Sequence, residues 1–306
     1  YYRPKKEREP IDFLSKKKVF FTISLVLIAA GLITIGVNAG RGNGAFAYSL
    51  EFQGGTSTNV TFDKDYSIDE IDKEIVPVVE KVTGDNNVQT QKVAGTNQVI
   101  IKTVTLDLDK REALNKAMVD NFGVDESKIT AENISSTVSN EMRRDAVIAV
   151  VIATICMLLY IWFRFKDIRF ATSAVLALLR DVLVVVGFYA IARISVGNTF
   201  IACMLTIVGY SINATIVIFD RIREEMRGKT KSSDVAAVVN KSITQTLTRS
   251  IYTSLTTFIM VAVLYVMGVS SIKEFALPLM VGVVCGAYSS VCITGALWYV
   301  MKRFKK

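Results

Sequence analysis

The residues from 208 to 223 place polar side chains inside a stretch that is otherwise apolar enough to cross a bilayer. They are Tyr210, Ser211, Asn213 and Thr215. Hydrocarbon cannot hydrogen-bond a hydroxyl or an amide, so such groups normally face other helices or a watery path. Arg249 adds an ionisable group at the head of another apolar segment. Together these residues indicate a transport machine rather than a passive membrane anchor.

These side chains must be positioned by membrane helices, as the composition of the chain indicates. Hydrophobic residues make up 51% of the 306 residues, and only four prolines interrupt the chain. The mean hydropathy is +0.38, which is outside the usual range of soluble proteins. Predicted spans lie at 19–37, 145–163, 170–192, 198–219, 250–267 and 275–301. Each is near the roughly 20 residues needed to cross a bilayer core, and six crossings put both termini on one side.

Lysine and arginine are distributed unevenly around these spans. Seven lie in residues 1–18, three in 164–169, six in 221–241 and four after Met301, whereas the opposite connections carry only Arg193 and Lys273. Short cytoplasmic loops carry the excess of cations, so both termini are expected in the cytoplasm. The formal net charge of +8 is thereby explained by topology. It favours contact with lipid headgroups over a nucleic-acid partner.

One long connection has the character of a soluble domain. The chain divides into a cytoplasmic segment 1–18, a span 19–37, an outside domain 38–143, five spans over 144–301 with a cytoplasmic loop 221–248, and a cytoplasmic tail 302–306. Residues 41–142 carry ten Lys and Arg against seventeen Asp and Glu, so the outside domain is acidic.

The pattern of this domain alternates between strand and helix. The expected elements are strands at 45–52 and 56–62, a helix after a Ser67–Glu70 capping box, strands at 88–93 and 98–104, a helix from Asp109 to Gly123, and a strand at 129–138. The order predicts an α+β, ferredoxin-like sandwich on an α-helical integral membrane protein.

Several classes of chemistry lack their residues. Histidine is absent, and the four cysteines all fall inside predicted spans. The sequence therefore gives no metal site, no cofactor and no Ser-His or Cys-His nucleophile, and no enzyme is expected. An intramembrane protease would need a Gly-x-Gly-Asp signature with a second Asp, and that arrangement does not occur.

Three runs of residues together resemble the SecF family of protein-export membrane proteins in the RND superfamily. The first joins Gly209 and Tyr210 to Asp220, Arg221 and Arg223; the others are 242–249 with 253–257, and 274–276 with 286–290. Arg180-Asp181 and Gly54-Gly55-Thr56 also fit this family. The resemblance covers the chain from about residue 19 to its end.

The resemblance implies a multi-pass protein of the prokaryotic cytoplasmic membrane. Its implied partners are SecD, the SecYEG channel, a translocating unfolded preprotein and, as a further candidate, YajC. The implied activity is to use the proton-motive force, or a sodium gradient, in late steps of protein export. Because the chain begins with Tyr1, we expect the second half of a fused SecD-SecF polypeptide or a trimmed form.

One position departs from the family pattern. SecF proteins typically have Asp after the Asn of the Gly-Tyr-Ser-x-Asn run, and an Arg matching Arg249 is its companion, but here the position is Ala214. Three interpretations remain open: an engineered or lineage-specific loss of activity, a proton carrier that is Asp181 or an acid supplied by SecD, and a sodium ion held by neutral oxygens and a carboxylate elsewhere. Ser211, Asn213 and Thr215 are the candidate oxygens. We favour the second interpretation, because Arg249 would otherwise be an unpaired buried cation.

The other candidate residues also have two interpretations. Arg249 could extend to the headgroups. Asp181 and Arg180 are adjacent, so we expect them to point to different helix faces without neutralising each other, and a structural role is as plausible as transport. Asp220, Arg221 and Arg223 are expected to pack at a helix end. Gly54 and Gly55 are expected to bend the backbone rather than to contact a ligand.

Three functions are therefore compared. The first is an ion-coupled SecF-type subunit. The second is an ion-uncoupled scaffold subunit, because the usual acid is Ala214. The third is another RND-type exporter, which would need a second large outside domain or twelve spans, and this sequence shows neither.

Overall fold

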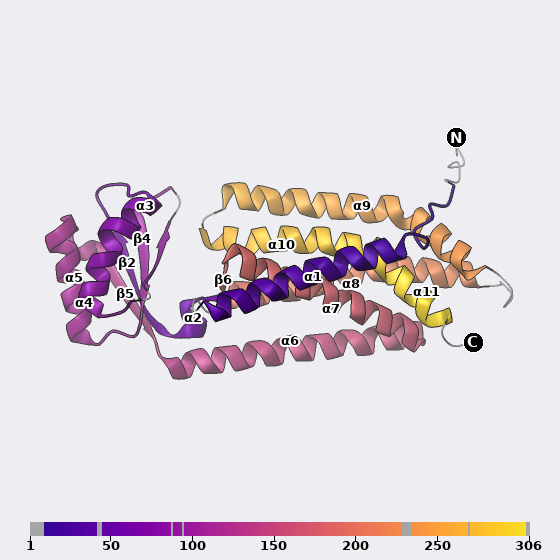
Figure 1. Cartoon of the computed structure of the whole chain (residues 1–306), viewed down its shortest axis with the longest axis horizontal. Coiled ribbons are helices and arrows are strands. Elements are labelled where there is room, and N and C mark those ends of the chain that lie inside the picture. The colour runs from indigo at the N-terminus through magenta and orange to yellow at the C-terminus, as the bar shows by residue number, and fades with distance from the viewer. Residues whose placement is uncertain are drawn as a thin grey trace.

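The structure is a computed structural model that describes residues 9–41, 45–86, 88–93, 95–227, 234–268 and 270–303. Long helices form a bundle, and a small α/β domain lies beyond one end of it (Figure 1). Helix α1 starts and helix α11 ends at the other end of the bundle (Figure 1).

In the part of the chain that the structure describes, the bundle contains six apolar helical segments that are long enough to cross a membrane. They are α1 (Lys17–Gly40), α6 (Ser136–Phe165), α7 (Ile168–Ala192), α8 (Asn198–Met226), α9 (Val235–Met267), and the sequence of α10 (Ser270–Ser289), the π-helical turn η3 (Ser290–Thr294) and α11 (Gly295–Arg303). The six predicted spans are thereby confirmed as helices of a multi-pass membrane protein.

The connection predicted at 221–248 is largely helical. Helix α8 continues to Met226 and α9 already begins at Val235, so most of the predicted loop is helical. The reason is burial, since Ile222, Val239 and Ile243 are at most 1% exposed. Periodic apolar side chains that are buried in this way stabilise helix beyond the bilayer.

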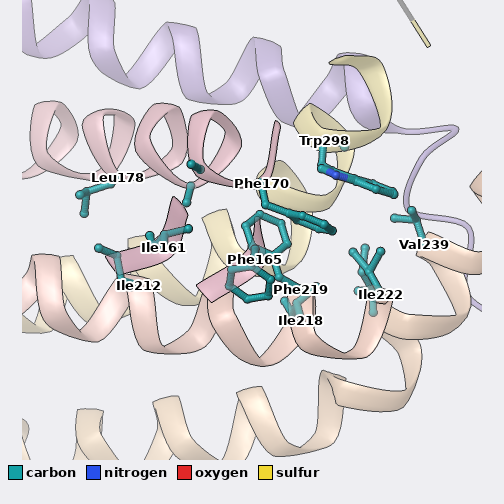
Figure 2. Packing of buried hydrophobic residues seen from close by; sticks show 14 of the residues in the cluster. Ile161, Phe165, Phe170, Leu178, Ile212, Ile218, Phe219, Ile222, Val239 and Trp298 are labelled. Carbon is teal, nitrogen blue, oxygen red and sulfur yellow. The ribbon is translucent and has the colours of Figure 1, made fainter. Parts of the chain in front are cut away.

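An aromatic cluster holds the helix ends together on this side of the bundle (Figure 2). The ring of Phe170 stacks on Trp298 with centroids 4.9 Å apart, and Phe219 meets Phe170 edge-on at 4.7 Å. Phe165 contributes a third phenyl ring from the end of α6. The cluster therefore joins α6, α7, α8 and α11.

The small domain is an antiparallel sheet with helices packed on it. Its elements are β2 (Gly55–Thr61), α3 (Ile68–Glu70), η1 (Ile71–Ile75), α4 (Val76–Thr83), β3 (Gln89–Lys92), β4 (Gln98–Thr103), α5 (Leu108–Phe122), η2 (Glu126–Lys128) and β5 (Ile129–Ile134). The strand order is β3-β4-β2-β5. Thr58 of β2 pairs with Ile101 on one side and Ala131 on the other.

Local sequence signals begin and end the helices of this domain. The predicted capping box is confirmed, because Ser67 and Glu70 exchange side-chain and backbone hydrogen bonds. Gly84 and Gly123 end α4 and α5 in the left-handed conformation, with φ of 70° and 65°. Glycine is favoured there because it has no Cβ to clash.

The strand predicted at 45–52 is wrong. Only β1 (Ala47–Tyr48) is extended, and α2 (Leu50–Gln53) follows it directly. Strand β2 already has β4 and β5 as neighbours, which leaves no place beside it. Strand β1 instead pairs in parallel with β6 (Ser195–Val196), the connection between α7 and α8. This pairing fixes the chain to the domain-side end of the bundle.

Candidate functional site

The centre of the bundle contains an ion pair between two consecutive residues of α7. The guanidinium Nη1 of Arg180 lies 2.7 Å from Oδ1 of Asp181, and their side chains are 8% and 0% exposed. The expectation that adjacent charges could not neutralise each other is therefore wrong. The arginine side chain is long enough for its guanidinium to reach the carboxylate around the helix. The expectation considered only the directions in which the two side chains leave the backbone.

The second carboxylate oxygen of Asp181 joins α7 to two other helices. Ser211 of α8 donates a hydrogen bond to Oδ2 over 2.7 Å, and Ser289 of α10 donates another over 2.6 Å. Both hydroxyl groups belong to buried residues. Each oxygen of Asp181 is thus satisfied by partners from this chain.

Arg180 in turn connects this cluster to α1. Its Nε donates to the hydroxyl of Ser24 over 3.2 Å, and its Nη1 also donates to the carbonyl of Cys285. The guanidinium carbon lies 4.9 Å from the centroid of the Tyr288 ring, a cation–π distance. The buried cation therefore has hydrogen-bonding, ionic and aromatic partners.

Further hydroxyl groups lie beside this pair. Thr215 of α8 and Ser290 of η3 approach to 3.5 Å, and Ser290 donates to the carbonyl of Gly286. Thr294 donates to the carbonyl of Ser289. A π-helical turn is frequent at functional sites because its altered ladder redirects side chains. Here it places Ser290 and Thr294 in the buried interior.

Two of the candidate residues on α8, Asn213 and Ala214, are less buried than Ser211 and Thr215. Asn213 is exposed and Ala214 is half-buried, whereas Ser211 and Thr215 are buried. Successive helical residues are rotated by about 100°, so Asn213 points away from Ser211 and Thr215, while Ala214 lies to one side of them. The candidate oxygens do not converge on one point, which removes the basis for a single sodium site built from all three.

Arg249 of α9 lies beside Asn213 and Ala214 of α8, on the outer side of the bundle. A small cavity of about 70 Å³ is lined by Tyr210, Asn213, Ala214 and Arg249, together with Ser250, Thr253 and Ser254. The Tyr210 hydroxyl lies 2.6 Å from that of Ser254 and connects α8 to α9 there. Arg249 is exposed, and its guanidinium has no hydrogen-bond or ionic partner in the described part of the chain.

The predicted site residues are thus divided between two places. Asp181, Ser211 and Thr215 belong to the inner cluster, whereas Asn213, Ala214 and Arg249 border the outer cavity. Sequence reasoning did not assign Ser24, Ser289 or Ser290 to the site. The run Tyr288-Ser289-Ser290, three polar residues inside an apolar span, was the signal that could have found two of them.

The charged residues at the end of α8 belong to neither place. Asp220 pairs with Arg164 of α6 at 3.1 Å, and Arg223 donates to the carbonyl of Arg164. Arg221 pairs with Glu224 at 2.6 Å and with Glu225 at 2.9 Å. These contacts fasten helix ends to one another.

The predicted glycines differ in what the backbone requires of them. Gly54 and Gly55, at the start of β2, have φ of 74° and 133°, values that residues with side chains rarely adopt. Gly209 of α8 has no atom within 4 Å of an added Cβ, so no close approach requires it. Among the described residues, no group of three or more Cys, Asp or Glu side chains could hold a metal ion.

Comparison with known proteins gives the chain a family. A family model described as "Protein export membrane protein SecD/SecF, C-terminal" matches residues 114–304. The match includes α6 to α11, the outer cavity and the inner cluster except Ser24 of α1. The chain belongs to the SecD/SecF family.

Relatives within the SecD/SecF family match nearly the whole chain. Protein translocase subunit SecF of Petrotoga mobilis is 35% identical over 97% of this chain and 98% of its own. SecDF of Bacillus subtilis is 36% identical over 95% of this chain, which spans only 38% of that longer protein.

A solved structure has the same fold. The crystal structure of SecDF from Thermus thermophilus has a TM-score of 0.81 at 30% identity, and covers 96% of this chain and 39% of its own. A SecDF structure in a "Super-membrane-facing form" has a TM-score of 0.67 over 99% of this chain. Both match the SecD/SecF family assignment of the sequence.

Proposed function

We propose that this chain is a SecF-type accessory subunit of the preprotein translocase that couples an ion gradient to late steps of protein export. Its SecF relatives match it along almost their full length. SecDF relatives contain the matching segment within a longer chain, which supports a SecD-type partner, either separate or fused. The SecYEG channel, YajC and an unfolded preprotein complete the proposed set of partners.

The proposed orientation places the α/β domain outside the cytoplasmic membrane and both termini inside. Cations gather at the opposite end of the bundle, at Arg164, Lys166 and Arg169 and at Lys302 and Arg303, while the domain is acidic. This asymmetry follows the positive-inside rule. We assign the domain to the ferredoxin-like class, on the strength of its β-α-β-β-α-β order and its β3-β4-β2-β5 sheet.

The state of Arg249 is the single observation that carries the coupling proposal. Its guanidinium is exposed on the bundle surface and meets no acid among the residues that the structure describes, whereas Arg180 is fully paired. Helix α8 runs about 24 Å from Asn198 to Ala214 at 1.5 Å per residue, still within a core of roughly 30 Å. A lone cation at that depth is costly, so an acid from the partner is its expected counter-charge.

Asp181 has a different role in this proposal. Its oxygens are already occupied by Arg180, Ser211 and Ser289, so it joins α7, α8 and α10. The carboxylate that takes up and releases protons is then the partner's, beside Arg249. When this carboxylate gains or loses a proton, its attraction to Arg249 changes, and with it the attraction between this chain and its partner. Such a change can convert an ion gradient into relative movement of the two subunits.

Ala214 favours one other function. The described residues that line the cavity beside Arg249 include no carboxylate. A subunit that had lost ion coupling would still bind its partner and support export as a scaffold. Export by the parent complex that persists after the ion gradient is collapsed would favour this second function.

The coupling proposal is tested by reconstituting the chain with its SecD-type partner and a translocation channel in vesicles. We expect Arg249→Ala to lose gradient-driven export by tenfold or more, the change that corresponds to about 1.4 kcal/mol. Arg249→Lys keeps the charge and should retain part of the activity. Tyr252→Ala, an exposed residue on the same helix, is the matched control. Undiminished gradient-driven export by Arg249→Ala would refute the coupling role.

A further inference from the structure

A second, larger cavity lies between α6 and the pair α7 and α8, away from both polar places. Its volume is about 550 Å³, and most of its lining is apolar. Val147 and Val150 line it from α6, Leu178 and Val182 from α7, and Met204 from α8. Val147 is also 63% exposed, so the groove opens sideways from the bundle surface to where lipid lies. Helix α6 runs along the edge of the bundle (Figure 1).

The domain-side end of this groove carries a positive charge. Arg143 lines it, one turn before the long uncharged stretch of α6. Its guanidinium carbon lies 4.9 Å from the ring centroid of Tyr48, and its Nε is buried without a hydrogen-bond partner. A buried donor without an acceptor requires an explanation. Arginine beside tyrosine at the end of a membrane span is typical of the headgroup level.

The dimensions of the groove fit one acyl chain. From Arg143 to Thr154, α6 rises about 16 Å at 1.5 Å per residue. One leaflet of a bilayer core is roughly 15 Å thick. If a methylene occupies about the volume of a water molecule, roughly 30 Å³, the groove holds on the order of 18 of them.

We propose that this groove binds a phospholipid of the domain-side leaflet. One acyl chain lies between α6 and α7, and the phosphate accepts hydrogen bonds from the guanidinium of Arg143. Arginine is suited to this contact, because its planar donors match phosphate oxygens in pairs. The bound lipid fills a space that would otherwise leave apolar side chains without contacts. It acts as a structural wedge that sets the distance of α6 from the bundle.

The test uses the full-length chain in lipid nanodiscs that contain a phosphatidylglycerol with a photoreactive group in mid-chain. We expect cross-links to concentrate on the peptides that contain Val150 and Leu178. Arg143→Gln should reduce this labelling by about tenfold, the effect of losing a charge-assisted hydrogen bond. Arg144→Gln, which changes the exposed neighbour, should leave it unchanged. Val150→Trp, which fills the groove, should reduce it without removing Arg143.

Labelling around Met260 of α9, which is 71% exposed, reports ordinary surrounding lipid. Circular dichroism and a thermal transition in nanodiscs show whether each variant is folded. Equal labelling of the groove and of Met260, with no response to Val150→Trp in folded protein, would overturn the proposal. So would protein cross-links, rather than lipid cross-links, from a photoreactive residue at Val147 in the complex with the SecD-type partner. That result would assign the groove to a partner segment.

Discussion

Gly31 of α1 and Gly187 of α7 bring their backbones into direct contact. A Cβ added to Gly31 would lie 2.7 Å from the Cα of Gly187, and a Cβ added to Gly187 would lie 2.8 Å from the Cα of Gly31. Small residues permit such close packing of membrane helices. The contact brings α1, which carries Ser24, against the helix that carries Arg180. Backbone packing therefore supports the buried ion pair.

Gly31→Ala should accordingly destabilise the bundle. An added methyl group inside a close contact forces the helices apart, at about 1–3 kcal/mol. Gly36→Ala on the same helix is the matched control, because an added Cβ there meets no atom within 4 Å. Unfolding by denaturant in detergent measures both variants. Equal midpoints for the two variants would contradict the packing argument.

Asp181→Leu should destabilise the protein more strongly. It leaves the Arg180 guanidinium buried without its counter-charge, a change that typically costs about 3–5 kcal/mol. Replacing both members with Leu removes this uncompensated charge, so the double variant should recover much of the loss. The matched control is Asp220→Leu, which breaks an ion pair whose side chains are 44% and 41% exposed. That change should cost roughly 1 kcal/mol or less. A double variant as unstable as Asp181→Leu would show that the hydroxyl contacts, not the charges, dominate.

Ala214→Asp distinguishes the interpretations of the unusual residue at this position. It adds a carboxylate to the cavity that Arg249 also lines. If the partner supplies the working acid, the new carboxylate competes for the same guanidinium, and we expect ion flux into vesicles to fall several-fold. Increased flux would indicate that the parent chain has lost activity, and unchanged flux that an acid at this position is dispensable. Ala214→Asn, with a similar volume and no charge, is the control.

The α/β domain should have a stability contribution from Glu70 that is lost in acid. The N–H of Ser67 donates to its carboxylate over 2.8 Å, and the ammonium of Lys64 over 2.9 Å. Led by the Ser67 hydrogen bond, these contacts lower the pKa of Glu70 from 4.5 to about 2. A lowered pKa stabilises the folded state above pH 4.5, and this contribution disappears as the pH falls toward 2.

Amide hydrogen exchange of residues 64–75 measures this contribution. Relative to Glu70→Gln, the parent protein should be better protected at pH 6, and the difference should shrink as the pH approaches 2. Asp69→Asn replaces an exposed acid in the same turn and serves as the control. A difference that stays constant from pH 6 to pH 2 would contradict a role for the Glu70 charge.

Patterns within short segments were predicted well from the sequence. The six spans follow from runs of apolar residues, and the helix ends at Ser67, Gly84 and Gly123 follow from local hydrogen bonding and backbone conformation. These features depend on neighbours within a few residues. The predicted strand at 45–52 failed because its partner, β6, is far away in the chain. The helical extent of the connection at 221–248 depends on distant aromatic residues, which bury its apolar positions.

The amino-acid sequence by itself determined the membrane class, the number of spans, the acidic domain after the first span and the resemblance to the SecF family. Only the tertiary structure decided that Asp181 meets Arg180, Ser211 and Ser289 in the interior, while Arg249 and Ala214 share an outer cavity. The physical reason is that side chains project from all sides of a helix, and each side of a helix in a bundle can face a different neighbouring helix. Which polar groups meet depends on how the helices are rotated and how closely they pack, and contacts such as that of Gly31 with Gly187 set both.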